Sequence, residues 1–273
     1  KETSGSTSTS KYFGMSDKAL AAQVSGRTLT DYMALYNSDK NNATFIKDYI
    51  ALKEELGYDD NAELADQYAN LLPVNSFLDY QTVVFIMAAG PYAYGKTYNL
   101  CRLNKKITDS IYKYEPLALR TLINNRIITN TMNKAIAHKD ITLAQQAARY
   151  AAATWALSNP KKGAVASASR MLGYYLAVND TASYLKQASF FYPNYYMNIS
   201  ADSAAKIDRE EYARTRNRAF RYPLNPGDRI IDNAVKINTA APNRVANILN
   251  SGAYLFYTSG TLNQTYLVNA LLW

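Results

Sequence analysis

Few residues in this chain could carry out chemistry, and their numbers argue against an active site. Among 273 residues there is one cysteine, Cys101, and one histidine, His138. A single cysteine excludes an intrachain disulfide framework and a cysteine-rich metal site, and a single histidine excludes a multi-histidine site. A Ser/His/Asp arrangement is also disfavoured, because His138 falls at an expected helix end, where an imidazole can interact with the last carbonyls. We therefore expect no catalytic residue, no metal and no cofactor, and we expect Cys101 not to be a redox centre.

Adjacent carboxylates do not change this expectation. The pairs are Glu54-Glu55, Asp59-Asp60 and Glu210-Glu211. Consecutive side chains on a helix do not face each other, so these pairs are poorly placed for acid and base catalysis. We interpret Asp59-Asp60 as the cap of a following helix. The chain is thus expected not to be an enzyme.

The densest charge lies between residues 209 and 222. On a helix, Arg214, Arg218 and Arg221 share a face that could bind a phosphate, an acidic glycan or an acidic protein. The alternative is a solvated face that pairs with its own carboxylates, since Glu210 lies one turn before Arg214. The net charge of +8 is otherwise scattered along the chain. Nucleic-acid binding would need a longer basic stripe with stacking aromatics, so no nucleic-acid partner is expected.

Tyrosine is unusually frequent, with 24 copies. It gathers in the run from Phe190 to Tyr196, where Tyr192, Tyr195 and Tyr196 could form a platform for a sugar or a peptide. The alternative is that this run ends a helix and packs on the next repeat. Both interpretations remain open at this point.

The elements that must position these residues read as helices joined by short loops. Apolar residues recur with the helical period from Tyr12 onward, and no segment alternates over a convincing strand length. Short loops require neighbouring helices to lie antiparallel. The expected helices run from Leu29 to Tyr36, from Asn42 to Gly57, from Asp59 to Pro73, from Asn75 to Ala89, from Pro116 to Ile136, from Asp140 to Asn159 and from Asp202 to Tyr222.

Two later units repeat one pattern. Leu172-Gly173-Tyr174-Tyr175 leads through a turn into Tyr184-Leu185-Lys186-Gln187-Ala188, and Gly252-Ala253-Tyr254 leads into Tyr266-Leu267-Val268-Asn269-Ala270. In both, a small residue beside an aromatic is followed by Tyr-Leu-x-x-Ala on a second helix. This is typical of tetratricopeptide hairpins, in which small residues let neighbouring helices approach closely.

These segments carry a resemblance over most of the chain from Arg27. The segments involved are Leu29-Thr30-Asp31-Tyr32-Met33, Phe45-Ile46-Lys47-Asp48-Tyr49 to Tyr68, Asn179-Asp180-Thr181 with Tyr184-Leu185, and Leu249-Asn250-Ser251-Gly252-Ala253-Tyr254. The chain is similar to the tetratricopeptide-like helical C-terminal region of Bacteroidetes thioredoxin-like proteins. The resemblance implies a thioredoxin domain upstream, whose Cys-x-x-Cys motif this chain lacks. Its aromatic and asparagine content also resembles that of SusD-type glycan-binding proteins, which likewise use tetratricopeptide helices.

We therefore expect an all-α fold of antiparallel hairpins in a tetratricopeptide-like right-handed superhelix. Residues 1–11 are expected to be a flexible linker, 12–114 the N-terminal hairpins and 115–273 the repeats. The expected function is a non-enzymatic scaffold or protein-interaction module of an exported thioredoxin-like protein in the periplasm or cell envelope. The partner would be a protein or peptide. The alternative is a periplasmic carbohydrate-binding module that uses exposed tyrosines.

The final helix adds an expectation about association. Tyr266, Leu267, Ala270 and Leu271 share one helical face, with Trp273 close by. A terminal repeat normally presents a polar outer face, and this one does not. We expect an exposed apolar patch there, which could support homo-association or cover by a following helix. No apolar run approaches the roughly 20 residues that span a bilayer, so no membrane span is expected.

Overall fold

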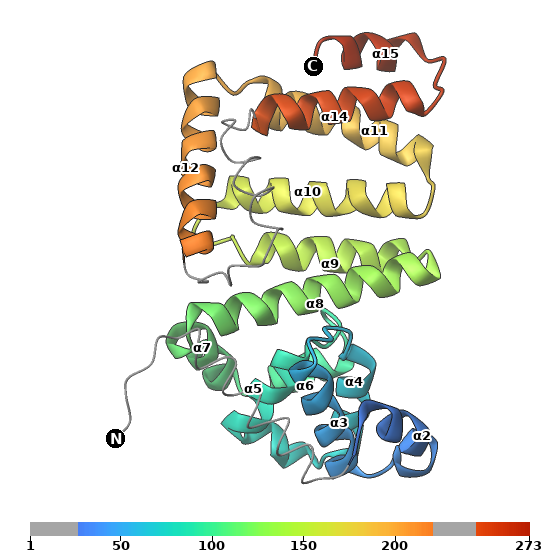
Figure 1. The fold of residues 1–273 in the computed structure, drawn as a ribbon, viewed down its shortest axis with the longest axis vertical. Helices are drawn as coiled ribbons and strands as arrows, with labels where there is room; N and C mark the ends of the chain where they lie inside the picture. The colour runs from blue at the N-terminus through green and yellow to red at the C-terminus, as the bar shows by residue number, and fades with distance from the viewer. Residues whose placement is uncertain (1–26, 221–243) are drawn as a thin grey trace, which may run out of the picture. The chain divides into compact units, whose positions relative to one another are not determined.

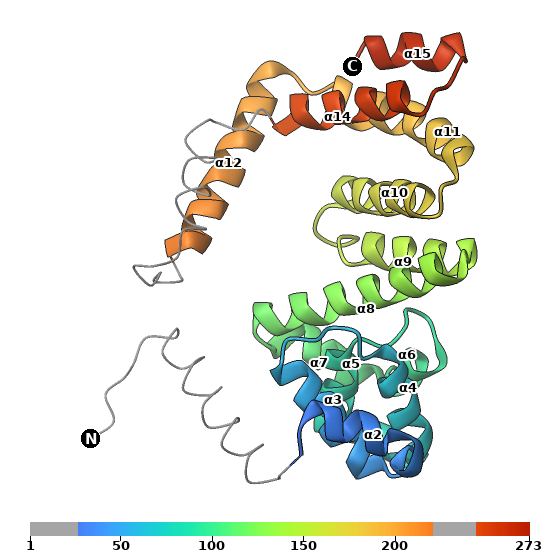
Figure 2. The ribbon, with the colours of Figure 1, turned by 45° about the vertical axis from the view of Figure 1, so that its right-hand side comes forward.

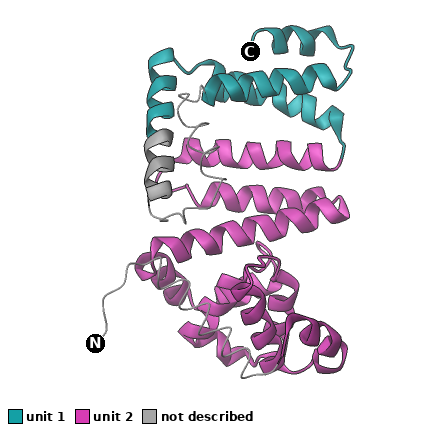
Figure 3. Ribbon diagram, in the orientation of Figure 1, with its two compact units in different colours: residues 1–14, 179–273 teal, residues 15–178 magenta. Residues whose placement is uncertain are grey.

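The computed structural model describes residues 27–220 and 244–273, and these described residues form helices, turns and loops with no strand. The expected all-α fold is confirmed. The chain divides into two compact units (Figure 3), one from Met15 to Val178 and the other containing Asn179–Trp273. The boundary expected at residue 115 therefore lies inside the first of these units. The expected linker at 1–11 falls outside the described residues, and the tetratricopeptide-like right-handed superhelix stays a prediction.

The unit that ends at Val178 contains nine α-helices and one short 3₁₀ turn among its described residues (Figure 1). They are α2 (Leu29–Asp39), α3 (Ala43–Glu55), α4 (Ala62–Leu71), η1 (Val74–Leu78), α5 (Tyr80–Ala89), α6 (Lys96–Cys101), α7 (Lys105–Tyr114), α8 (Leu117–His138), α9 (Ile141–Ala153) and α10 (Pro160–Ala177). The helices α8, α9 and α10 lie side by side in both views (Figures 1 and 2).

Side-chain caps set several helix starts. Asn42 accepts hydrogen bonds from the first turn of α3, and Asp140 does the same for α9, as the sequence predicted. Gly57 follows α3 with a φ of 85°, in the left-handed region that suits glycine after a helix. Thr28 and Asp31 form a reciprocal capping box at the start of α2.

The predicted start is wrong for two helices, α4 and α5. Asp59-Asp60 does not cap α4, whose first flanking residue is Asn61. Instead, Asp59 accepts a hydrogen bond from Arg126 and Asp60 pairs with Lys53. The helix expected from Asn75 begins later, at Tyr80, because Asp79 supplies the cap and residues 74–78 form the 3₁₀ turn η1. Long-range partners override the local signal in the first case, and a stronger cap does so in the second.

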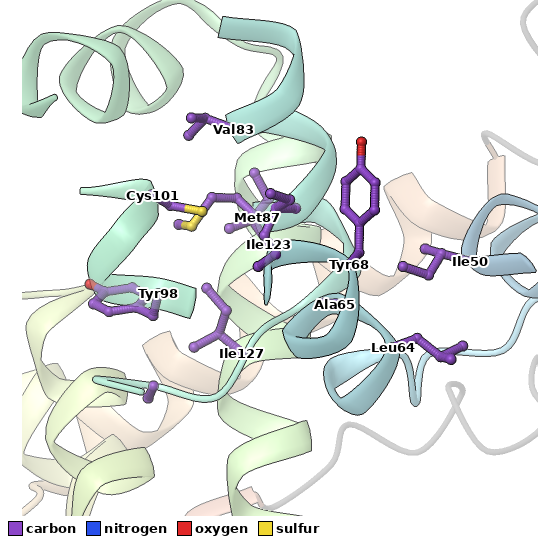
Figure 4. Packing of buried hydrophobic residues seen from close by; sticks show 14 of the residues in the cluster. Ile50, Leu64, Ala65, Tyr68, Val83, Met87, Tyr98, Cys101, Ile123 and Ile127 are labelled. Carbon is purple, nitrogen blue, oxygen red and sulfur yellow. The ribbon is translucent and has the colours of Figure 1, made fainter. Parts of the chain in front are cut away.

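The core of this unit is built from aliphatic and aromatic side chains of α2 to α9 (Figure 4). Ile46, Ile50, Ile86, Ile123 and Ile127 are fully buried in it. Each helix contributes one apolar face, so the core forms only when the helices pack together. The helical period that predicted these faces is therefore confirmed for this unit.

A polar cluster joins α7, α8 and α9 at the edge of this core. The hydroxyls of Tyr112 and Tyr150 lie 2.9 Å apart, and both donate to Oδ1 of Asn124, at 2.9 and 3.0 Å. Burial raises the pKa of the Tyr150 hydroxyl well above its ordinary value, so it remains a protonated donor. Tyrosine thus serves helix packing here, with its ring buried and its polar tip satisfied.

The second unit contains four described α-helices and one π-helical turn. They are α11 (Thr181–Tyr192), η2 (Pro193–Met197), α12 (Ala201–Phe220), α14 (Arg244–Thr258) and α15 (Gln264–Leu271). In Figures 1 and 2, α14 lies between α11 and α15, while α12 runs across the direction of α14. Tyr184, Phe256 and Trp273 bring α11, α14 and the end of α15 together through ring contacts. Within the described residues, no helix combines the length and the apolar character that crossing a bilayer requires.

Candidate functional site

The predicted aromatic platform is placed mainly in helix packing. Tyr192 is buried, with its ring centroid 4.6 Å from that of Trp273 and 5.2 Å from that of Phe191. Its hydroxyl lies 3.3 Å from the hydroxyl of Tyr184. Because a Cβ atom at Gly252 would come within 2.5 Å of this ring, α14 contacts the face of Tyr192 directly. The structure therefore assigns Tyr192 to packing between α11, α14 and the chain after α15.

Tyr195 and Tyr196 are half-buried and flank Phe191, with centroid distances of 5.4 and 5.5 Å. Ligand binding by these two rings stays a prediction. Arg214 and Arg218 lie within α12, but their side chains, and Arg221 as a whole, fall outside the described residues. The predicted anion-binding face is thus not tested.

The structure instead places a pocket of about 550 Å³ in the unit that ends at Val178. It lies between α2, α3, the turn before α4, α4 itself, the loop after α5 and the C-terminal half of α8. Its walls combine aromatic, aliphatic, amide and charged side chains. They are Met33, Tyr36, Tyr49, Lys53, Asp60, Ala62, Glu63, Leu64, Tyr92, Asn130, Asn133, Lys134, Ala137 and His138.

The loop that carries Tyr92 is fixed by α8. Asn130 donates to the carbonyl of Gly90 at 2.8 Å, and the backbone N–H of Ala93 donates to the hydroxyl of Thr131 at 2.8 Å. Gly90 has a φ of 76°, and a Cβ atom there would lie 2.5 Å from Cβ of Arg126. Buried hydrogen bonds on both sides of Tyr92 therefore fix the backbone of the loop that carries this ring.

Arg126 ties the same helix to α3 and α5. Its guanidinium donates to Glu54 at 2.7 Å, to Asp59 at 2.8 Å and to the carbonyl of Ala88 at 2.8 Å. Its side chain is buried, so the planar fork is needed to satisfy acceptors from three segments. This arrangement sets the position of α8 behind the pocket.

The charges in the pocket pair with each other. The ammonium of Lys53 lies 2.9 Å from a carboxylate oxygen of Asp60, and that of Lys134 lies 4.0 Å from Glu63. Lys134 also sits 4.0 Å from the centroid of the Tyr92 ring, within the range of a cation–π contact. These two lysines and two carboxylates together carry no net charge.

Burial and the nearby carboxylates keep the Tyr92 hydroxyl protonated at neutral pH. Burial raises the pKa of the Tyr92 hydroxyl, and the charges of Glu63 and Asp66 raise it further. Burial also raises the pKa of Asp66 above its ordinary value. At neutral pH the Tyr92 hydroxyl is therefore a hydrogen-bond donor at the pocket wall, 3.4 Å from Glu63.

The two residues with nucleophilic or acid–base potential lie apart in different settings. Cys101 is fully buried in the core, and burial raises its pKa from 9.0 to about 12. Arg102 does not lower that pKa, because its guanidinium donates to the Tyr98 hydroxyl at 2.7 Å. His138 ends α8, as predicted, and its exposed ring lines the pocket. Among the described residues, no group of three or more His, Cys, Asp or Glu side chains is arranged to hold a metal.

Comparisons with protein-family models, with curated proteins and with solved structures find no match to this chain. Its function must therefore be argued from its own residues.

The pocket residues were not singled out from the sequence. Tyr36 and Tyr49 belong to apolar stripes that predict core positions, and both are in fact half-buried. Tyr92 follows the Gly90-Pro91 helix break, which was the one available signal for a fixed loop. Asn130, Asn133, Lys134 and Ala137 share one side of α8, but only the fold shows that this side faces α2 to α4.

Proposed function

We propose that this chain is a non-enzymatic helical-repeat module that holds a protein or peptide partner, within an exported thioredoxin-like protein of the periplasm or cell envelope. The family and location rest on the sequence resemblance of Leu29–Tyr68, Asn179–Leu185 and Leu249–Tyr254. The helical hairpins are consistent with such a module, because stacked hairpins present extended surfaces for binding.

One observation carries the interaction role. Val268 and Leu271 of α15 and its C-cap residue Leu272 follow at i, i+3 and i+4, and Leu271 is 85% exposed and Leu272 67% exposed. On α14, Tyr254 and Tyr257 lie three residues apart and are also exposed. Exposed apolar side chains grouped on a helical surface mark interaction sites, because their burial by a partner is favourable.

Site-specific photo-crosslinking in cells tests this proposal. A photoreactive residue would replace Leu271 in the intact natural protein, and the matched control would carry it at Leu157, which is fully exposed in the other unit. We expect a discrete protein adduct, found in the periplasmic or envelope fraction, from position 271 and not from 157. Leu272→Asp should reduce that adduct at unchanged protein level. Equal labelling at both positions, or no protein adduct at 271, would contradict the proposal.

A further inference from the structure

The pocket is an open cavity, and other contacts set the positions of the three tyrosines in its wall. The Tyr49 ring stacks on Tyr32 with a centroid distance of 5.4 Å and an interplanar angle of 10°. Tyr36 contacts Tyr49 and donates its hydroxyl to Gln67. The third ring, Tyr92, is held by the α8 bonds to Gly90 and Ala93. A site whose walls are already ordered loses little conformational entropy when a ligand binds.

The charged side chains of the pocket balance, so its lining offers no net charge to attract a charged ligand. Lys53 pairs with Asp60 at 2.9 Å, and Lys134 lies 4.0 Å from Glu63 and 4.0 Å from the centroid of the Tyr92 ring. Neither sign of charge is in excess among these four side chains, so an uncharged ligand matches this lining.

The remaining chemistry of the walls is divided between rings and hydrogen-bonding groups. Three tyrosines supply apolar surface, whereas Asn133 and the exposed carboxylates of Asp60 and Glu63 supply donors and acceptors at the same cavity. A ligand with several hydroxyl groups and apolar C–H faces matches both kinds of group. The volume of about 550 Å³ is within the range of small-ligand sites, about 300–1,000 Å³.

We propose that this pocket is a binding site for a neutral saccharide. The sugar hydroxyls bond to the carboxylates, to Asn133 and to the Tyr92 hydroxyl, while its C–H faces pack on the tyrosine rings. This assigns sugar binding to residues other than Tyr192, Tyr195 and Tyr196. It is also independent of the protein-partner role, whose surface belongs to α14 and α15.

Calorimetry and saturation-transfer NMR with defined trisaccharides test the proposal on the full chain. The neutral probes are triacetylchitotriose, cellotriose and maltotriose. The charged probes are the cationic glucosamine trimer, which differs from the first only by its missing acetyl groups, and the anionic trigalacturonate. We expect at least one neutral trisaccharide to bind, and each charged probe to bind at least tenfold more weakly. Failure of all three neutral probes, or equal binding of their charged counterparts, overturns the proposal.

Two matched pairs of variants place the binding in the pocket. Tyr92→Ala should weaken binding at least tenfold, whereas Tyr114→Ala should not, although Tyr114 likewise carries a lysine near its ring, Lys113 at 4.9 Å. Because Tyr92→Ala could disturb the loop, a filling variant provides a second test. Ala137→Trp adds volume at an exposed lining position of α8, and Thr129→Trp adds it on the same helix away from the pocket.

We expect Ala137→Trp to abolish binding and Thr129→Trp to leave it unchanged, with equal helical content by circular dichroism. Binding that survives Ala137→Trp would overturn the pocket assignment. A neutral capped tetrapeptide serves as the competing ligand class. If it binds the pocket and no saccharide does, the site belongs to a peptide partner and the saccharide proposal is wrong. The crosslink from Leu271 is unaffected by any of these variants, so the two proposals fail separately.

Discussion

At the scale of single residues, Gly90 is a position where both the backbone conformation and the packing require glycine. Its φ of 76° is left-handed, and an added Cβ atom would meet Cβ of Arg126 at 2.5 Å. Gly57 has a similar φ of 85° but open space around its missing Cβ. The two positions therefore separate backbone strain from overpacking.

We predict that Gly57→Ala lowers the free energy of unfolding by about 1 kcal/mol, from left-handed strain alone. Gly90→Ala should lower it by about 2–4 kcal/mol, because an overpacking cost of roughly 1–3 kcal/mol adds to the same strain. Urea unfolding followed by circular dichroism measures both. If both variants lose the same free energy of unfolding, the loop between α5 and α6 can shift to accommodate the added methyl group and the overpacking argument is wrong.

The buried thiol of Cys101 predicts a pH effect. Its pKa is raised in the folded protein from 9.0 to about 12, because burial disfavours the thiolate. The folded state then holds its proton more tightly than the unfolded state. The stabilisation is complete below about pH 9 and is lost as pH rises toward 12, by about 1.4 kcal/mol per unit of pKa difference.

Urea unfolding of the natural protein and of Cys101→Ala, at pH 8 and pH 10.5, measures this effect. Shared tyrosine titration acts on both proteins, so the difference between them isolates the thiol. We expect the natural protein to lose more stability over this interval than Cys101→Ala. Rapid alkylation of Cys101 by iodoacetamide in the native protein at neutral pH would contradict the burial argument.

At the scale of elements, the two copies of the repeat pattern differ in what their glycines do. Gly252 of α14 approaches the Tyr192 ring so closely that a Cβ atom would lie 2.5–2.8 Å from ring carbons. Gly173 of α10 has no atom within 4 Å of the place a Cβ would take. The shared sequence pattern therefore marks a close helix approach in only one of the two copies.

We predict opposite signs for alanine at these positions. Gly173→Ala should raise the free energy of unfolding by up to about 1 kcal/mol, since alanine is the better helix former. Gly252→Ala should lower it by about 1–3 kcal/mol, because Tyr192 is wedged between Phe191 and Trp273 and has little room to move. Thermal unfolding of each variant measures the sign. Destabilisation by Gly173→Ala would indicate a packing role that the structure does not show.

The helical type of most elements was predictable, because the period of Phe45, Ile46 and Ile50 and caps such as Asn42 and Asp140 are local signals. No helix limits were predicted within 92–114, where the structure places α6 and α7. The start of α4 was not, because Asp59 and Asp60 look like caps until Arg126 and Lys53 are brought beside them. The pocket was likewise beyond local reasoning. Tyr36, Tyr92 and Asn133 come from distant segments, and only tertiary packing places them around one cavity.

At the scale of the whole molecule, the end of the chain separates residues that stabilise from residues that associate. Of the face expected to be exposed, only Leu271 is exposed, whereas Tyr266, Leu267 and Ala270 are half-buried. Leu272, outside that face, is also exposed, and Trp273 packs on Tyr192 and Phe256 at 4.6 and 4.7 Å. Exposed leucines contribute little to folding but favour contact between molecules. Half-buried Trp273 should contribute to folding stability and little to contact between molecules.

We therefore predict a crossed result for two variants. Leu271→Lys should change the free energy of unfolding by no more than about 0.5 kcal/mol, as is usual for surface positions, and should weaken concentration-dependent self-association. Trp273→Ala should cost on the order of 2 kcal/mol, less than full burial of a tryptophan would imply, and should leave the exposed leucines in place. Urea unfolding and sedimentation velocity over a hundredfold concentration range measure the two effects. If Leu271→Lys destabilises the fold as much as Trp273→Ala, the face of α15 is a packing surface within the molecule and not an interaction site.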